Sequence, residues 1–87
     1  HAMPIEIQGT PNPNALKFSV GVPVGGPTTV VPGKPSDDPT ANAIAEIEGV
    51  TSVFMTADFV TLTKTPEADW QAIVDIAHPL LANRFGD

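Results

Sequence analysis

Two prolines with one asparagine between them, at positions 11 and 13, constrain the fold of this chain more than any other feature. Each proline fixes its own φ at about −65° and disfavours helical backbone at the residue before it. The neighbouring asparagines, Asn12 and Asn14, favour turns. Apolar and polar side chains then alternate over residues 16–20, as in a half-buried strand. The sequence therefore predicts a rigid turn that leads into a strand, and this turn is either a plain connection or a contact surface.

Alternating patterns predict four main strands. Residues 4–8 and 15–20 flank the proline turn, so an antiparallel hairpin is their simplest pairing. Residues 50–55 and 59–63 are rich in β-branched and aromatic side chains and predict a second hairpin. In its second arm both faces carry apolar side chains, and we favour Val60 and Leu62 as the residues that face the core.

The stretch between the two hairpins begins with a long irregular segment. Residues 21–38 contain eight glycines and prolines, which no regular element tolerates. We expect a long surface loop, with a short edge strand at residues 28–31 as a further possibility. The valines of this loop have no evident core position, so the loop is either mobile or an arm that contacts a partner.

Capping residues predict two helices. Asp38 and Pro39 suit the N-cap and first position of a helix of about ten residues that stops at Gly49. Thr65 and Pro66 suit the same positions of the last helix. The apolar stripe of the last helix consists of Trp70, Ile73, Val74, Ala77 and Leu81.

Proline 79 lies inside the last predicted helix. A proline cannot donate the backbone hydrogen bond and its ring clashes with the preceding turn, which costs about 3 kcal/mol in a regular helix. We therefore predict a kink near residues 75–79, with residues 80–85 continuing as a further turn or two. A straight, unbroken helix through Pro79 would refute this prediction.

The predicted order of elements is β-β-α-β-β-α. Two helices on one face of an antiparallel sheet make a two-layer α+β fold, and residues 1–87 suffice for one small domain. The order of the strands does not follow from the sequence. His1 and Ala2 precede a methionine and are interpreted as the remnant of a cleaved tag.

Charge and composition exclude several classes of function. The net charge is −6, so binding to nucleic acid or to an anionic membrane surface is not expected. No segment has the roughly 20 apolar residues of a membrane span, and the N-terminus lacks a signal-peptide pattern, so we expect a cytoplasmic location. The chain has no cysteine, which excludes disulfides, cysteine nucleophiles and an iron–sulfur cluster held by its own thiolates.

Catalytic and metal-binding candidates are few. His78 and Asp75 could share one helical face, but two ligands do not make a structural zinc site, which needs about four. No serine has the context of a hydrolytic nucleophile. We expect no enzyme and no cofactor, and keep a small metal-dependent enzyme that uses Asp58, Asp75 and His78 as a third hypothesis.

Three segments resemble a known family. Residues 10–18, Thr-Pro-Asn-Pro-Asn-Ala-Leu-Lys-Phe, resemble the signature of the N-terminal domain of NifU-like (Nfu) iron–sulfur cluster assembly proteins. Gly49-Val50 with residues 53–64 resembles that family's glycine-valine and hairpin block, and Ala68-Asp69-Trp70 is a third match. The resemblance implies the same α+β architecture. Cluster-carrying Nfu proteins use a C-x-x-C motif on a separate C-terminal domain, and these residues contain no such motif.

Protein recognition is the function that these observations favour. The resemblance implies a non-catalytic, stand-alone module for iron–sulfur cluster assembly or delivery whose partners are scaffold, carrier or client proteins. The alternative is a generic interaction or regulatory domain with no iron–sulfur role. The candidate partner-binding residues come from the turn, the strand after it and the second hairpin, where core packing is the competing explanation: Asn12, Pro13, Asn14, Lys17, Phe54, Met55, Asp58 and Phe59.

Overall fold

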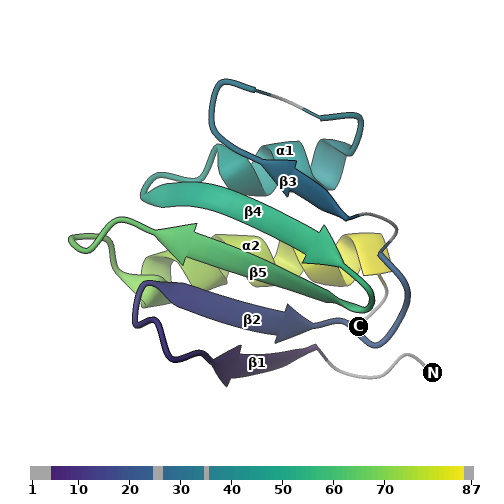
Figure 1. Ribbon diagram of the computed structural model, residues 1–87, viewed down its shortest axis with the longest axis horizontal. Coiled ribbons are helices and arrows are strands. Elements are labelled where there is room, and N and C mark those ends of the chain that lie inside the picture. Colours follow the sequence, from purple (N-terminus) through teal and green to yellow (C-terminus); the bar gives the residue numbers. More distant parts are fainter. Residues whose placement is uncertain (1–4, 25–26, 35, 86–87) are drawn as a thin grey trace.

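The computed structural model describes residues 5–24, 27–34 and 36–85, so the proposed tag remnant His1-Ala2 lies outside the described residues. Seven elements follow one another along the chain (Figure 1). They are β1 (Glu6–Gly9), β2 (Ala15–Ser19), β3 (Thr28–Val30), α1 (Pro39–Ala45), β4 (Val50–Thr56), β5 (Phe59–Lys64) and α2 (Trp70–Phe85).

The strands form one antiparallel sheet in the order β1-β2-β5-β4-β3. Both predicted hairpins are present, and β5 occupies the centre because it pairs with β2 on one side and β4 on the other. The short strand β3 is the edge strand anticipated within residues 28–31. Both helices lie against the same face of the sheet (Figure 1), which confirms the two-layer α+β fold.

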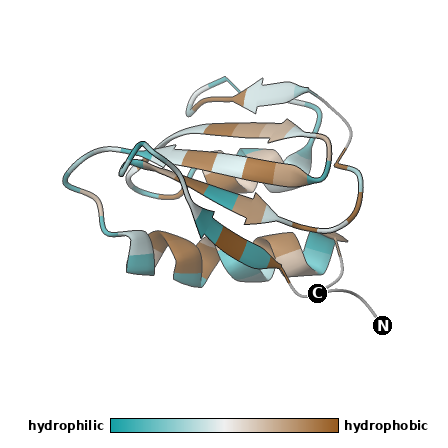
Figure 2. Cartoon of the chain, turned by 60° about the horizontal axis from the view of Figure 1, so that its bottom comes forward, coloured by the Kyte–Doolittle hydropathy of each residue, from teal (hydrophilic) through white to brown (hydrophobic). Residues whose placement is uncertain are grey.

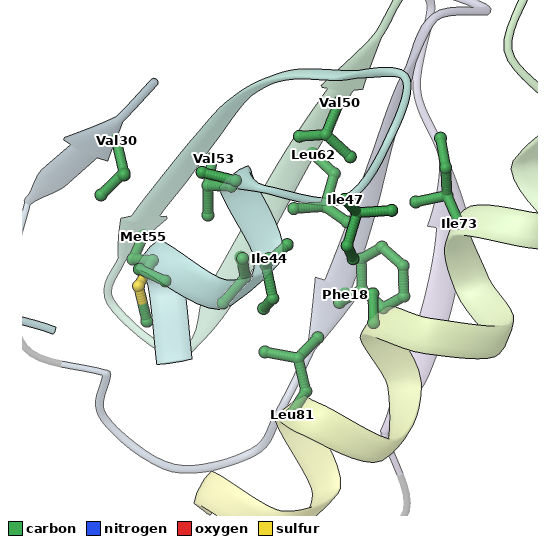
Figure 3. Close-up of a cluster of buried hydrophobic side chains, with 14 of the residues drawn as sticks. Phe18, Val30, Ile44, Ile47, Val50, Val53, Met55, Leu62, Ile73 and Leu81 are labelled. Atoms are coloured by element: carbon green, nitrogen blue, oxygen red, sulfur yellow. The ribbon is translucent and has the colours of Figure 1, made fainter. Parts of the chain in front are cut away.

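The core fills the space between the sheet and the two helices. Phe18, Val53 and Leu62 from the sheet are fully buried and meet Ile44 of α1 and Leu81 of α2 (Figure 3). Burial alternates along β5, where Val60, Leu62 and Lys64 are buried and the residues between them are half-buried. Brown and pale bands along the strands show the mixture of hydrophobic and polar residues in the sheet (Figure 2). Val60 and Leu62 are both completely buried, which confirms the face chosen for the core.

Part of the 21–38 segment belongs to this core. Val24 and Val30 are buried, and the backbone N–H of Val24 donates to the carbonyl of Ala57 at 2.9 Å. The expectation that these valines lack core positions is therefore wrong, because β3 and Val24 pack along the edge of the helix-covered face. Val22, in contrast, is 39% exposed.

The first helix has the predicted beginning. The Asp38 carboxylate accepts hydrogen bonds from the backbone N–H groups of Thr40 and Ala41, as an N-cap does. The helix spans seven residues and ends at Ala45, and is therefore shorter than predicted. Gly49 follows with a φ of +95°, in the left-handed region that favours glycine.

The last helix begins later than predicted. Residues 65–68 form a turn in which Ala68 N–H donates to the Thr65 carbonyl, and α2 starts at Trp70. Thr65 is therefore not the N-cap of α2, and its backbone N–H donates to the Gly49 carbonyl at 2.9 Å, which holds Thr65 beside the start of β4. Asp69 takes the capping role, since its carboxylate accepts from the N–H of Gln71.

Pro79 does not end the last helix, and the kink predicted near residues 75–79 stays a prediction. Helix α2 continues as one helix from Trp70 to Phe85 with Pro79 inside it. Pro79 and Asp75, whose carbonyl loses its helical partner, are both exposed. Water can therefore satisfy that carbonyl, and the helix continues because Ile73, Ala77 and Leu81 remain anchored in the core.

Candidate partner-binding surface

The proline turn is held by its own side chains. Thr10 Oγ1 donates to the carbonyl of Asn12 and also receives the Asn12 backbone N–H. The Asn12 side-chain oxygen accepts from Asn14 N–H at 2.9 Å, and Ala15 N–H donates to the Asn12 carbonyl at 3.0 Å. Asn12 therefore has the local role that the turn chemistry predicts, while both Asn12 and Pro13 remain exposed.

The same turn is hydrogen-bonded to the C-terminal end of β5 and to the first residue of α2. Lys64 Nζ donates to the side-chain oxygen of Asn14 at 3.1 Å, and Lys64 N–H donates to the Asn14 carbonyl at 2.8 Å. The indole Nε1 of Trp70 donates to the Pro13 carbonyl at 3.0 Å. These contacts join three segments that are far apart in sequence, so the turn has a structural role at this end of the sheet.

Lys64 is a residue whose importance the sequence analysis missed. It is only 8% exposed, and its ammonium group also donates to the Thr65 carbonyl and lies 5.7 Å from the centre of the Trp70 ring. The alternation of β5 is a partial signal for this position, because it points Val60, Leu62 and Lys64 to the same side, whereas the charge of Lys64 argues for the surface. Neutral oxygens and an aromatic face thus surround this buried cation.

A second group of candidate residues gathers on the face of the sheet that the helices leave open. Lys17 of β2 and Phe54 of β4 are both paired with Thr61 of β5, so the three residues form a row across three strands. Lys17 Nζ lies 4.4 Å from the centre of the Phe59 ring. We call Lys17, Phe54, Phe59 and Thr61 the outer-face cluster.

Two predicted hairpin residues lie elsewhere. Met55 is 1% exposed and packs in the core, so its assignment to a contact surface is wrong. It points away from Phe54 because successive strand residues face opposite sides of the sheet. Asp58 is exposed at the tip of the hairpin, where its carbonyl accepts from Val20 N–H at 2.9 Å.

The predicted binding residues thus occupy two regions. Asn12, Pro13 and Asn14 lie at the end of the sheet where β5 finishes, whereas Phe59 and Asp58 lie at the opposite end of β5 (Figure 1). The third hypothesis finds no support, because residues 5–24, 27–34 and 36–85 contain no group of three or more histidine, aspartate and glutamate side chains able to hold a metal ion. Asp75 instead accepts a hydrogen bond from Gln71.

No helix within the described ranges is long and apolar enough to cross a membrane.

The sequence of this chain is similar to those of known proteins. The chain is 44% identical over 73 residues to the human "NFU1 iron-sulfur cluster scaffold homolog, mitochondrial", covering 79% of this chain and 29% of that protein. It is 40% identical over 72 residues to "NifU-like protein 5, mitochondrial" from Arabidopsis thaliana, again with 79% of this chain and 26% of the relative. The chain therefore spans less than a third of the length of these relatives.

Solved structures show the same fold. The crystal structure of protein SAV1430 from Staphylococcus aureus has a TM-score of 0.74 at 30% identity, covering 90% of this chain and 98% of that one. A NifU-like protein from Saccharomyces cerevisiae has a TM-score of 0.70 at 24% identity, covering 94% of this chain and 77% of that one, and shares the fold. The family described as "Scaffold protein Nfu/NifU N terminal" matches residues 5–85. By sequence and by fold, this chain belongs to the family of Nfu/NifU N-terminal domains.

Proposed function

We propose that this chain is a non-catalytic docking domain that serves iron–sulfur cluster assembly or delivery by binding a scaffold, carrier or client protein. The observation that carries the proposal is the family match over residues 5–85 in a sequence without cysteine. Cysteine thiolates are the usual ligands of such clusters, so these residues depend on another protein or region to hold one. Their contribution is then recognition.

The outer-face cluster is the surface we assign to that recognition. Phe54 is 37% exposed at the open face of the sheet. Thr61 lies beside it on β5, and Lys17, which contacts the Phe59 ring, follows Thr61 in the same row on β2. A protein interface typically combines an aromatic centre with a polar rim, and this cluster has both. The four residues come from three paired strands, so they are already ordered and lose little entropy on binding.

The proline turn and the hairpin tip extend this proposal to the two ends of the sheet. Asn12 and Pro13 are exposed on a turn whose backbone is fixed by hydrogen bonds, and Asp58 is exposed at the hairpin tip. Asn14 and Lys64, which hold the turn in place, act as positioning residues in this assignment. A cytoplasmic location remains our expectation for this chain, although the names of the human and Arabidopsis relatives place those proteins in mitochondria.

A generic interaction domain without an iron–sulfur role is the second candidate. The two functions differ in the partner, because only the first requires binding to a protein of cluster assembly.

The test measures binding of the chain to a purified, cluster-loaded iron–sulfur scaffold protein, and the visible absorbance of the cluster reports its transfer to a client. We expect a complex whose affinity falls about tenfold or more in Phe54→Ser, because the exposed aromatic side chain would be lost from the centre of the interface. Ile7→Ser is the matched control, since Ile7 is 42% exposed on the edge strand β1, outside the outer-face cluster. Equal loss in both variants would contradict the assignment of the surface, and no binding to scaffold, carrier or client would contradict the function.

A further inference from the structure

A groove of about 560 Å³ lies between the end of α1 and the start of α2, away from the outer-face cluster. It is mostly apolar on its inside, and Ile47, Ala72 and Ile76 supply its aliphatic surface. Ile76 is 51% exposed, more than Ile7, Val22 or Phe54. Ala72 is exposed as well and lines the same groove, so the two side chains form a contiguous apolar surface on α2, and such surfaces mark sites where a partner binds.

The floor of the groove is fixed by a close contact between two segments. The backbone N–H of Thr65 donates to the Gly49 carbonyl at 2.9 Å. A Cβ atom placed on Gly49 would lie 2.6 Å from the Cβ of Ala68, so the glycine allows the two chains to approach. The groove therefore exists before any partner arrives, and binding does not have to order a loop.

The rim of the groove carries only one sign of charge. Glu48, Glu67 and Asp69 line it and are all exposed, and none of the described lining residues is lysine, arginine or histidine. Lys64, the nearest cation along the chain, directs its ammonium group to Asn14 and to the Thr65 carbonyl. The groove thus combines an aliphatic floor with a negative rim.

Other occupants fit this chemistry less well. The carboxylates are not part of any group of three or more residues able to hold a metal ion in the described part of the chain. A second copy would bring a net charge of −6 against the same negative rim. A nucleic acid would meet the rim with like charge.

We propose that this groove binds a basic segment of a partner protein, with an aliphatic side chain placed against Ile76 and lysine or arginine side chains beside Glu48, Glu67 and Asp69. The proposal rests on the docking function above and specifies the chemistry of one partner segment. The complementary charges select the partner segment and orient it. The aliphatic side chain of the partner is buried against Ile76, and this apolar contact supplies the main part of the binding free energy.

The test titrates the isotopically labelled chain with short peptides and follows the backbone amides by NMR. A peptide that alternates leucine with lysine should shift the amides of Glu48, Ala72 and Ile76. A peptide with leucine and glutamate, and one with serine and lysine, should bind at least about tenfold more weakly, because each lacks one half of the complementarity. Raising the salt concentration should weaken binding of the first peptide.

Variants of the groove make the test specific. Ile76→Ser should weaken the leucine–lysine peptide about tenfold, and Glu67→Gln should weaken it severalfold and reduce its salt dependence. Ile7→Ser and Glu6→Gln are the matched controls on β1 and should leave binding unchanged. Shifts confined to the outer-face cluster, equal binding of the serine–lysine peptide, or a dimer in sedimentation that Ile76→Ser abolishes would each overturn the proposal.

The two proposals fail in different ways. If the scaffold protein binds Ile76→Ser as well as the parent chain but does not bind Phe54→Ser, the groove proposal falls and the docking function stands. If no protein of cluster assembly binds while the peptide still shifts the amides of the groove, the proposed role in iron–sulfur cluster assembly is contradicted and the groove proposal stands.

Discussion

Lys64 and Asn14 are 50 positions apart in the sequence, yet the Lys64 ammonium group donates to the Asn14 side-chain oxygen at 3.1 Å. This contact closes the end of the sheet, because Asn14 belongs to the proline turn and Lys64 is the last residue of the central strand β5. Trp70 completes the closure through its hydrogen bond to the Pro13 carbonyl. The segment that resembles the Nfu family signature therefore also has a structural role, because it joins the turn to β5 and α2.

Asn14→Ala should lower the free energy of unfolding by about 1–3 kcal/mol, because the mostly buried Lys64 ammonium group loses an acceptor. Asn83→Ala, on the exposed side of α2, is the matched control and should change it by less than about 0.5 kcal/mol. Urea denaturation followed by the fluorescence of Trp70, the single tryptophan, measures both. Equal stability of the two variants would show that the contact between Lys64 and Asn14 contributes nothing.

Lys17 and Phe59 should be energetically coupled, since the ammonium nitrogen lies 4.4 Å from the ring centre. A double-mutant cycle with Lys17→Met and Phe59→Leu should give a coupling free energy of about 0.5–1 kcal/mol, as for partly exposed cation–π pairs. The single variants should remain folded, because neither residue belongs to the core. If the effects of the two substitutions on the free energy of unfolding were strictly additive, the contact between Lys17 and Phe59 would not persist in solution.

Gly49→Ala should destabilise the chain by about 2–4 kcal/mol, since φ is +95° and the new Cβ would meet the Cβ of Ala68 at 2.6 Å. Adding Ala68→Gly should restore only the part due to the clash, because the backbone conformation stays unfavourable. Gly9→Ala serves as the control, since it has open space around it and no positive φ. Thermal unfolding of all three variants separates the steric cost from the backbone cost. If Gly49→Ala left the stability unchanged, the close contact between Gly49 and Ala68 would be contradicted.

Pro79→Ala should stabilise the chain by about 1–3 kcal/mol, because α2 continues through Pro79 and alanine would restore the missing backbone hydrogen bond. Calorimetric unfolding measures the gain. A loss of stability would indicate that the helix is bent at Pro79 in a way that its packing requires, as the sequence analysis anticipated.

The sequence predicts this fold well where local chemistry and the alternation of side chains agree. The Asp38 cap, the two hairpins and the inward face of β5 all follow from such patterns. The face of β4 does not, because the register shifts between Val50 and Ser52, which lets Val50 and Val53 both be buried although they are three positions apart.

The errors arose where a distant contact overrides a local signal. Residues 65–68 have the sequence of a helix start, but they form a turn that is hydrogen-bonded to Gly49, 16 positions before Thr65, and α2 begins only at Trp70. Lys64 follows the inward alternation of β5, yet its charge argues for the surface unless Asn14 and Trp70 are known to lie beside it. The groove between α1 and α2 depends on the placement of both helices and therefore has no local sequence signature.

The central claim is that these residues act by docking onto another protein and do not themselves hold an iron–sulfur cluster. The most direct measurement is reconstitution of the purified chain with iron and sulfide, followed by titration with a cluster-loaded scaffold protein, with iron content and visible absorbance recorded for each component. If the chain acts by docking alone, we expect a complex in which the cluster stays with the partner and the separated chain carries no iron. A stoichiometric cluster chromophore on the isolated 87-residue chain would contradict it.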